Sequence, residues 1–539
     1  MTAPARNERA CTTTGPQPPG TALVVTPHCL ASEAACVILD GGGNAVDAAI
    51  AANAVLGVVL PDTCGPGGDL FALLHLEGSE TPIALNASGR AGSGIDADRL
   101  RDHGLGSIPR RSPWSVTVPG CVDGWIALSA RHGELGLAAC LEPAIAIARQ
   151  GFPVSRELAA ELASVAGLLV GQPSARSLYP NGEAPAEGTG IQRPLLAETL
   201  EGIATTGRDG FYRGAVAAGI TEASKGAITP DDLIDNTPDW IEPISCGLFR
   251  QTGWTIPPNS QGYLTLATLA VFDLLDPPDD PLDPLFHHLL IESYRSVAWE
   301  RAAFVSDART APHDPATLLA QERLSAIAAT IDPGRAGRWP HPAPAPKGTA
   351  YLAVADAKGL TVSLIQSNFS GIGAGLTAGD TGVFLHNRGA GFTLIQGHPN
   401  EYAPGKRPLH TLAPTLWTSD RRATLALGTR GGDQQPQFLA QFAALHHHAG
   451  LCIDDAQQFP RWSMRQPAPG TDSHLVVESR LPDRAIASLT ELGHRLESTR
   501  AWHPDFGPVS AADLGRDRAG AADPRVSTST ALAAPNRRA

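Results

Sequence analysis

At 539 residues, with 42% hydrophobic and 18% charged residues, the chain is long enough for several domains or for one large layered domain. Its net charge of −13 and the lack of a long basic run argue against nucleic acid and acidic membranes as partners. The first twenty residues hold no apolar core of signal-peptide length, so we expect a cytoplasmic protein.

The cysteines and histidines show no metal-binding pattern. The eight cysteines are widely separated and include no Cys-x-x-Cys pair, which predicts reduced thiols rather than a zinc site. The run from His446 to His448 lies in an expected helix, where consecutive side chains point in different directions. We therefore predict neither a metal nor a cofactor.

The N-terminal part predicts a disordered segment followed by packed helices. Residues 1–20 are polar and rich in Pro, Thr and Gly, and we expect them to be disordered. Ser32 is a candidate helix start, and the glycine run 41–43 ends that helix. Asn44 and Asp47 form a capping-box pattern before an apolar helix. Asp47 is therefore interpreted as a cap rather than as a catalytic acid.

A glycine-rich loop at residues 65–68 comes before a strand-like apolar run at 70–76. A nucleotide-binding glycine loop follows a strand and opens a helix, which is the opposite order. Tight backbone packing is thus the preferred interpretation of these glycines. In the stretch IALNASGRAG, residues 83–92, Arg90 lies just beyond another expected strand.

The middle of the chain is rich in helical patterns. Two long amphipathic helices are expected within 263–275 and 284–304, and the second contains the neighbours His287 and His288, which we expect at the surface or at the edge of the core. We interpret the proline-rich stretch at 335–347 as a processing loop rather than as a boundary between domains, because strand- and helix-forming sequence lies on both sides of it.

The stretch 347–376 predicts a β-hairpin that turns at Lys358-Gly359 and whose first strand begins at or next to Thr349. A threonine hydroxyl is a weak nucleophile unless a base is adjacent. At a free amino terminus its own α-amino group, with a pKa of about 7.7–8.0, supplies that base. Cleavage after Gly348 would create such a terminus, and the unhindered glycine carbonyl suits that step.

Acyl-enzyme chemistry also needs N–H donors for the oxyanion. Gly431 and Gly432, in a turn between an expected strand and an expected helix, are candidate donors. Gly-Thr and Gly-Gly pairs are common in turns, so these two patterns alone favour an ordinary turn.

Further stretches occur in a fixed order along the chain, among them GGGNAVDAAIAANAVLGVVLP, VPGCVDGW, EPAIAIARQGFPVS, PPNSQGY, GTAYLAVADAKG, PGKRPLHTLAPT and GTRGGDQQPQ. From about residue 21 to 526 the chain resembles the γ-glutamyltransferase family of N-terminal-nucleophile hydrolases. The resemblance implies an α/β protein with a four-layer αββα sandwich, made as a proenzyme that cuts itself before Thr349. It further implies a large chain (21–348 after the disordered segment) and a small chain (349–539), which stay interwoven in one domain. A higher homo-oligomer is left open.

The resemblance also assigns roles to single residues. Thr349 matches the nucleophile, and Ser367 matches the hydroxyl residue that hydrogen-bonds it. His410 and Thr411 fall on a pair of serines that helps to hold the γ-glutamyl carboxylate. The glycine pair 431–432 falls on the oxyanion glycines.

The substrate pocket departs from the family pattern. Ala390 and Gly391 stand where transpeptidases have the aspartates that recognise the glutamyl amino group. Phe369 replaces an asparagine, although Asn368 is adjacent, and Ser88 aligns near the arginine that clamps the α-carboxylate. These changes indicate a donor that has a carboxylate but does not need an ammonium group.

Three arginines, Arg90, Arg388 and Arg430, are candidates to bind that carboxylate. Each could instead be a solvated charge or part of a structural ion pair. The pattern is similar to the divergent branch that includes oxamate amidohydrolase and cephalosporin-acylase-like proteins. The complete set of candidate substrate-binding residues is Arg90, Asn368, Arg388, His410, Thr411 and Arg430.

Two functions within one enzyme class follow as hypotheses. The first is cleavage or transfer of γ-glutamyl amides, such as glutathione, through a threonyl acyl-enzyme. The second is hydrolysis of another carboxylate-bearing amide, of the oxamate or glutaryl type. A non-catalytic scaffold, the third possibility, would predict a chain that is never cut.

Overall fold

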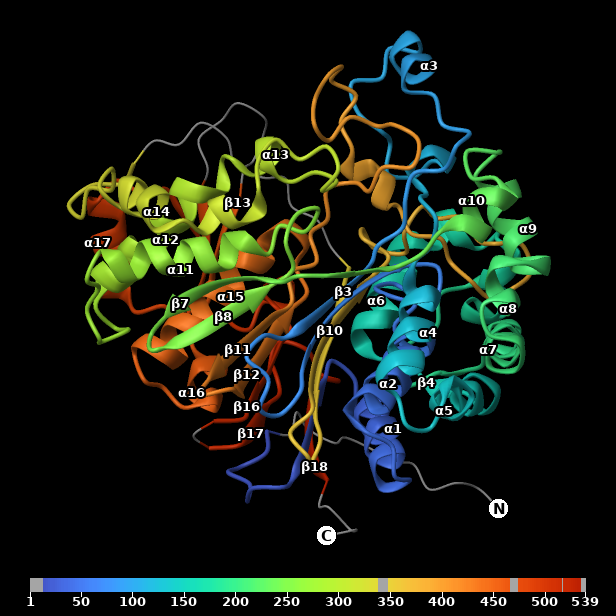
Figure 1. Ribbon diagram of the computed structural model, residues 1–539, viewed down its shortest axis with the longest axis horizontal. Coiled ribbons are helices and arrows are strands. Elements are labelled where there is room, and N and C mark those ends of the chain that lie inside the picture. Colours follow the sequence, from blue (N-terminus) through green and yellow to red (C-terminus); the bar gives the residue numbers. More distant parts are fainter. Residues whose placement is uncertain (1–12, 338–347, 466–473, 516, 535–539) are drawn as a thin grey trace.

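The computed structural model describes residues 13–337, 348–465, 474–515 and 517–534, and it is built around two antiparallel sheets (Figure 1). The first sheet has seven strands in the order β18 (Thr530–Ala534), β1 (Ala22–Thr26), β9 (Ala350–Ala355), β10 (Thr361–Ser367), β2 (Asp69–His75), β3 (Ile83–Ala87) and β6 (Asp239–Ile241). The second has six, in the order β17 (Ala519–Ala521), β16 (Val509–Asp513), β12 (Arg422–Thr429), β11 (Thr415–Ser419), β8 (Gln251–Thr255) and β7 (Ile244–Leu248).

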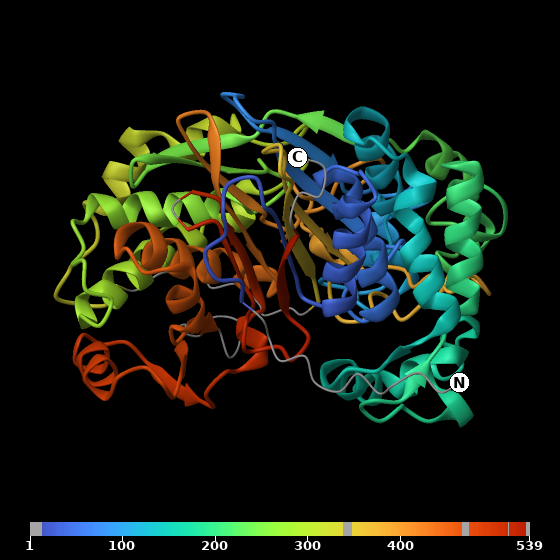
Figure 2. The same ribbon diagram turned by 90° about the horizontal axis from the view of Figure 1, so that it is seen from below.

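The two sheets pack face to face, and helices cover both outer faces (Figures 1 and 2). Side chains such as Phe71, Tyr351 and Leu416 fill the space between the sheets. Outside the first sheet lie α1 (Cys29–Asp40), α2 (Ala45–Val59), α4 (Cys121–His132), α5 (Leu137–Gln150) and α7 (Pro194–Thr206). Outside the second lie α11 (Tyr263–Leu274), α12 (Pro284–Ala298) and α15 (Gln435–Ala443). This αββα order confirms the expected fold class.

The remaining elements are shorter or peripheral. They are α3 (Ala97–Asp102), β4 (Phe152–Pro153), α6 (Arg156–Leu169), β5 (Gly190–Ile191), α8 (Asp209–Tyr212), α9 (Gly214–Ala223), α10 (Pro230–Asp235), α13 (Arg301–Phe304), α14 (Gln321–Ala328), α16 (Ile453–Gln458), β13 (Trp462–Arg465), β14 (His474–Glu478), α17 (Asp483–Glu491) and β15 (Leu496–Thr499). Among the residues that the structure describes, no helix has both the length and the apolar character needed to span a bilayer.

Both sheets mix strands from the two sides of the expected cleavage point. In the first sheet β9 and β10 lie between β1 and β2, and in the second β11 pairs with β8. Strands held on both edges by ladder hydrogen bonds cannot separate without unfolding the sheet. Two chains cut before Thr349 would therefore stay together, although the cut itself, and with it the boundary between the chains, remains a prediction.

The expected disorder of residues 1–20 stays a prediction, but the last residues of this segment have contacts with the sheet. Residues 1–12 lie outside the described residues, but residues 13–20 do not stand free. The backbone N–H of Thr14 donates to the carbonyl oxygen of Gly520 over 2.9 Å, and Gly520 N donates to Thr14 Oγ1 over 2.7 Å. Gly520 belongs to the edge strand β17, whose unpaired backbone groups need partners. The contacts of Thr14 thus extend the pairing of this edge strand.

The caps of the first helices follow the sequence in part. Asn44 and Asp47 form the expected capping box of α2. The first helix, however, begins at Cys29 rather than near Ser32, because the imidazole of His28 accepts a hydrogen bond from Leu30 N over 3.2 Å and acts as its cap. The expected hairpin of β9 and β10 is confirmed.

The two adjacent histidines of α12 are buried rather than at the surface or core edge. His288 Nδ1 lies 2.8 Å from His494 Nε2, and His494 Nδ1 accepts from Arg295 over 3.2 Å. His288 Nε2 lies 3.0 Å from the carbonyl oxygen of Asp332. A single assignment of protons to the two rings satisfies all of these contacts. The resulting series of hydrogen bonds connects His288, before the expected cleavage point, with His494, after it.

Candidate active site

The glycine loop 65–68 packs tightly against the end of β10. A Cβ atom at Gly67 would overlap the carbonyl oxygen of Phe384, and one at Gly68 would overlap Gln366 Nε2. Close backbone packing is thus the confirmed interpretation of these glycines. The loop leads into β2, whose Asp69 pairs with Ser367 across the strands.

Thr349 lies directly before β9 and is 3% exposed. Its Oγ1 atom is 2.7 Å from the carbonyl oxygen of Gly348 and 3.3 Å from Ser367 Oγ. The side-chain amide of Gln435, at the start of α15, donates to Thr349 Oγ1 over 3.4 Å. The hydroxyl is therefore held beside the carbonyl group of the preceding peptide bond, as an intramolecular attack on that bond requires.

Gly348 has a backbone geometry that only glycine adopts easily. Its φ is +98°, and a Cβ atom there would lie 2.9 Å from Gly371 N. Ser367 Oγ donates to its carbonyl oxygen over 2.6 Å. This donor polarises the carbonyl and would stabilise the oxyanion that forms when Thr349 attacks it.

Ser367→Ala should therefore slow the cut between Gly348 and Thr349. The loss of one oxyanion donor lowers rates by about 100-fold or more, and we expect a slowing of that size. The measurement is a time course of purified precursor on a denaturing gel. Ser363→Ala is the matched control, since Ser363 lies on the same strand but bonds Tyr351 and the Thr415 carbonyl oxygen. Equal cleavage rates for the two variants would contradict this role.

Gly431 and Gly432 form the turn between β12 and α15, with φ values of +129° and +55°. The side chain of Gln261 donates to Gly432 O over 2.9 Å and to Thr411 O over 3.0 Å. The turn that carries the two candidate oxyanion donors leads directly into α15, whose first residue is Gln435. The structure thus brings this turn and the Thr349 hydroxyl together.

His410 is fully buried beside Asp69. Its Nε2 atom lies 3.1 Å from Asp69 Oδ2, and its Nδ1 accepts from Leu412 N over 3.3 Å. Burial and the neighbouring Arg388 lower the pKa of His410 to about 3, so the ring is neutral. Burial alone would raise the pKa of Asp69, but His386 and His410 hold it down at about 2. Both ring nitrogens are thus engaged in contacts within the protein, and the substrate-binding role expected of His410 and Thr411 stays a prediction.

Arg388 is fully buried next to Thr411 and Phe369. Its Nη1 donates to Thr411 Oγ1 over 3.2 Å, and its Cζ lies 3.9 Å from the centre of the Phe369 ring. Among the described residues, none hydrogen-bonds its Nε or Nη2. Burial lowers the pKa of Arg388 to about 9, which leaves it a cation at neutral pH. A buried cation with two unused donors is suited to an anionic group.

The other candidate residues have different surroundings. Arg90 forms ion pairs with Asp239 at 3.1 Å and Asp307 at 3.4 Å, which is the structural pairing that the sequence left open. Arg430 donates through Nη2 to the carbonyl oxygen of Pro504 over 2.9 Å. Asn368 donates to the carbonyl oxygen of Pro61 over 3.3 Å. The charge of Arg90 is thus balanced by two acidic partners.

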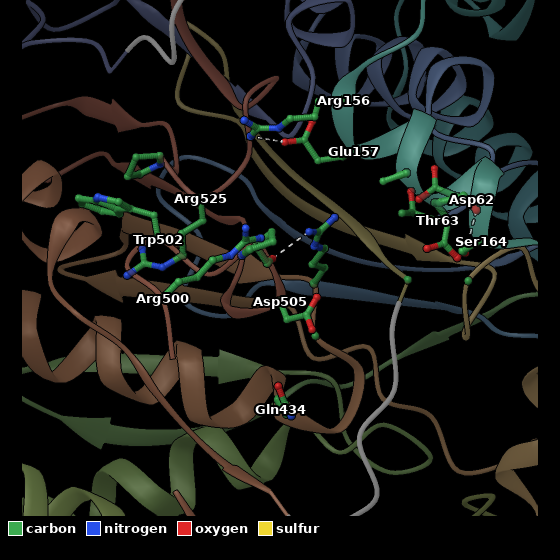
Figure 3. A pocket seen from close by; sticks show the side chains of 18 of the residues that line it. Asp62, Thr63, Arg156, Glu157, Ser164, Gln434, Arg500, Trp502, Asp505 and Arg525 are labelled. Carbon is green, nitrogen blue, oxygen red and sulfur yellow. Dashed lines mark hydrogen bonds and ion pairs between the residues drawn. The ribbon is translucent and has the colours of Figure 1, made fainter. Parts of the chain in front are cut away.

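A cavity of about 910 Å³ reaches Gly348 and Gly431 (Figure 3). Asp62, Thr63 and Ser164 lie on its α6 side, and Arg500, Trp502 and Arg525 lie on the opposite side. Its size matches that of small-molecule sites. Both acidic and basic groups reach it, among them Asp62, Glu157, Glu161, Arg430, Arg500 and Arg525.

The family model described as Gamma-glutamyltranspeptidase matches residues 31–533. The chain belongs to this family. It is 35% identical to the glutathione hydrolase-like YwrD proenzyme of Bacillus subtilis, over 93% of this chain and 97% of that protein. It is 34% identical to the oxamate amidohydrolase proenzyme of Klebsiella pneumoniae, over 91% and 94%. The crystal structure of cephalosporin acylase from Bacillus halodurans superposes with a TM-score of 0.87 and 31% identity, covering 99% of both chains.

Membership of the gamma-glutamyltranspeptidase family makes the chain an enzyme of the hydrolase and acyltransferase type. Three residues of the site escaped the sequence analysis. Gln435 lies in the quoted GTRGGDQQPQ stretch, where it was given no role, and Asp69 follows the glycine loop, whose glycines were interpreted as packing residues. Asp62 sits in a loop with no pattern that would single it out.

Proposed function

We propose that this gamma-glutamyltranspeptidase-family enzyme cuts itself before Thr349 and then hydrolyses small amides whose acyl part carries a carboxylate. The substrate class is inferred from the surroundings of Arg388. Its guanidinium is buried, its Nη1 group donates to Thr411, and its Nε and Nη2 groups have no partner among the described residues. A carboxylate would pair with the guanidinium through two parallel hydrogen bonds.

The chemistry follows from the groups around Thr349. Its Oγ1 attacks the amide carbonyl carbon while its freed α-amino group takes the hydroxyl proton. The N–H groups of Gly431 and Gly432 stabilise the oxyanion, and the leaving amine departs with the proton. The remaining ester is then cleaved by water, which releases the acid. Gln435 and Ser367 keep the hydroxyl in place throughout.

The substituted positions of the pocket support a donor without an ammonium group. Phe369 covers the guanidinium of Arg388 where the family usually has an asparagine. Ala390 and Gly391, in the short turn after Arg388, offer no carboxylate to an amino group. The names of two relatives, oxamate amidohydrolase and cephalosporin acylase, agree with such donors.

A second candidate is the γ-glutamyl donor, favoured by the 35% identity to a glutathione hydrolase-like proenzyme. Glutathione as the natural donor, transfer to an acceptor amine and a cytoplasmic location stay predictions. The two candidates differ in one chemical group, because only a γ-glutamyl donor carries the α-amino group.

The deciding experiment compares three 4-nitroanilides: glutaryl, γ-glutamyl and valeryl. We expect kcat/KM for the glutaryl compound to exceed that of each other compound by at least about tenfold, a difference of about 1.4 kcal/mol. A preference for the γ-glutamyl compound would support the second candidate. Equal cleavage of the valeryl compound, which has no carboxylate, would contradict the proposal. Ammonia release from oxamate extends the comparison to smaller donors.

A further inference from the structure

We propose that Asp62 holds the water molecule that hydrolyses the Thr349 acyl-enzyme, and that it thereby directs the reaction to water rather than to an acceptor amine. The inference rests on the proposed function, because it concerns the second half of that reaction. Asp62 has no part in the mechanism described above.

Asp62 lies in the loop after α2 and stands between two cavities. It lines the large cavity, and it also lines a small one of about 20 Å³ that Thr349 borders. A space of at least about 10–15 Å³ is sufficient for one water molecule. Thr63, Glu157 and Arg430 border both cavities as well. Water from the large cavity thus has a small, polar site next to the nucleophile.

The carboxylate of Asp62 has an acceptor to spare. Its Oδ1 atom is buried and has no hydrogen-bond partner among the residues that the structure describes. Burial and the nearby Glu161 raise the pKa of Asp62 to about 7, against the opposing effect of Arg430. A carboxylate of this kind accepts a hydrogen bond from water and can take up a proton near neutral pH.

The other charged groups at the small cavity are already occupied. Glu157 accepts from Ser527 Oγ over 2.7 Å and from Arg156 over 3.0 Å. Arg430 donates to the carbonyl oxygens of Pro504 and Gly507. Figure 3 shows Glu157 next to Arg156, apart from Asp62 and Thr63. Of the two described acidic side chains that border the small cavity, Asp62 is the one with an oxygen that has no hydrogen-bond partner in the described part of the chain.

The step balances with water as the co-reactant. The water oxygen forms a bond to the acyl carbon, and the bond from that carbon to Thr349 Oγ1 breaks. One water proton passes to Asp62. The α-amino group is neutral at this stage, because the leaving amine took its proton, so the proton on Asp62 is passed through the α-amino group or solvent to Thr349 Oγ1 as the ester bond breaks. The products are the free acid and the regenerated threonine.

The test measures how the acyl-enzyme divides between two nucleophiles. Glutaryl 4-nitroanilide is turned over in the presence of hydroxylamine, and glutarate and glutaryl hydroxamate are quantified beside the released 4-nitroaniline. We expect Asp62→Asn to raise the hydroxamate-to-glutarate ratio at least about tenfold, since proton transfer by a positioned group contributes about 10²–10⁴-fold to a rate. The first-turnover burst of 4-nitroaniline should keep its amplitude. Asp62→Glu, which keeps the carboxylate, should recover part of the wild-type ratio.

Glu157→Gln is the matched control, because it removes a carboxylate from the same two cavities, and its ratio should change less than about twofold. An unchanged ratio in Asp62→Asn would overturn the inference, even if overall turnover fell. If Asp62→Asn stays uncut, Asp62→Ser carries the same comparison with the same criterion. Failure of the proposed function looks different: the wild-type enzyme would then show neither a burst nor any hydroxamate.

Discussion

Replacing Thr349 by alanine is expected to give a single uncut chain without amidase activity. The variant has no hydroxyl to attack the Gly348 carbonyl and, without the cut, no α-amino group to act as base. Loss of a nucleophile typically lowers kcat by about 10⁴-fold or more, and we expect at least that. A denaturing gel and a 4-nitroanilide assay measure both effects on one preparation.

Thr349→Ser is the matched control for this variant. It keeps a hydroxyl in the same position and should therefore retain cleavage and part of the activity, while a residue that only filled space would be replaced equally well by alanine. A Thr349→Ala chain that is still cut at this bond, or that turns over amides at the wild-type rate, would contradict the role of Thr349.

Arg388→Met is expected to change the substrate preference rather than to abolish the chemistry. Methionine keeps an apolar stem but removes the cation that faces Thr411. Losing one partner of a buried charged pair costs about 2–5 kcal/mol, so kcat/KM for glutaryl 4-nitroanilide should fall about 30-fold or more. The valeryl compound, which has no carboxylate, should be affected little.

Arg90→Met provides the comparison for Arg388. Its guanidinium is held by Asp239 and Asp307, so its loss should leave the glutaryl-to-valeryl ratio unchanged. Arg388→Lys should recover only part of the rate, because an ammonium group cannot form two parallel hydrogen bonds with a carboxylate. An equal fall for the glutaryl and valeryl compounds in Arg388→Met would show that Arg388 acts through the fold and not through the substrate carboxylate.

The backbone segments that hold the nucleophile and the candidate oxyanion donors could be predicted from local sequence. The hairpin that begins next to Thr349 and the glycine turn 431–432 depend on alternation and on turn residues, which are properties of neighbouring positions. The capping box at Asn44 is local in the same way. The family motifs added the four-layer arrangement, which no single stretch could specify.

The charged residues of the site could not be ranked from sequence, because their partners are distant along the chain. Arg90 meets Asp239, 149 residues away, whereas Arg388 is buried under Phe369 and has no acidic partner in hydrogen-bond contact among the described residues. Both look alike as isolated arginines. Asp62 acquires its raised pKa from burial and from Glu161 on α6, contacts that exist only in the folded chain.

The interwoven sheets give the cut a specific consequence. Because β9 is paired on both sides, cleavage before Thr349 would free an amino terminus inside the site without loosening the strand that carries it. The nucleophile and its base would then be created in one step at a fixed position. Gly348 itself packs so closely against Gly371 that a side chain at this position would be crowded.

The central claim is that Thr349 becomes the amino terminus of a second chain, and intact-mass analysis with N-terminal sequencing of the purified protein tests it most directly. We predict two chains, of which the smaller spans residues 349–539 and has threonine as its first residue, and amidase activity that rises as they appear. A fully active protein that remains one uncut chain, or one whose smaller chain begins at another residue, would contradict the account.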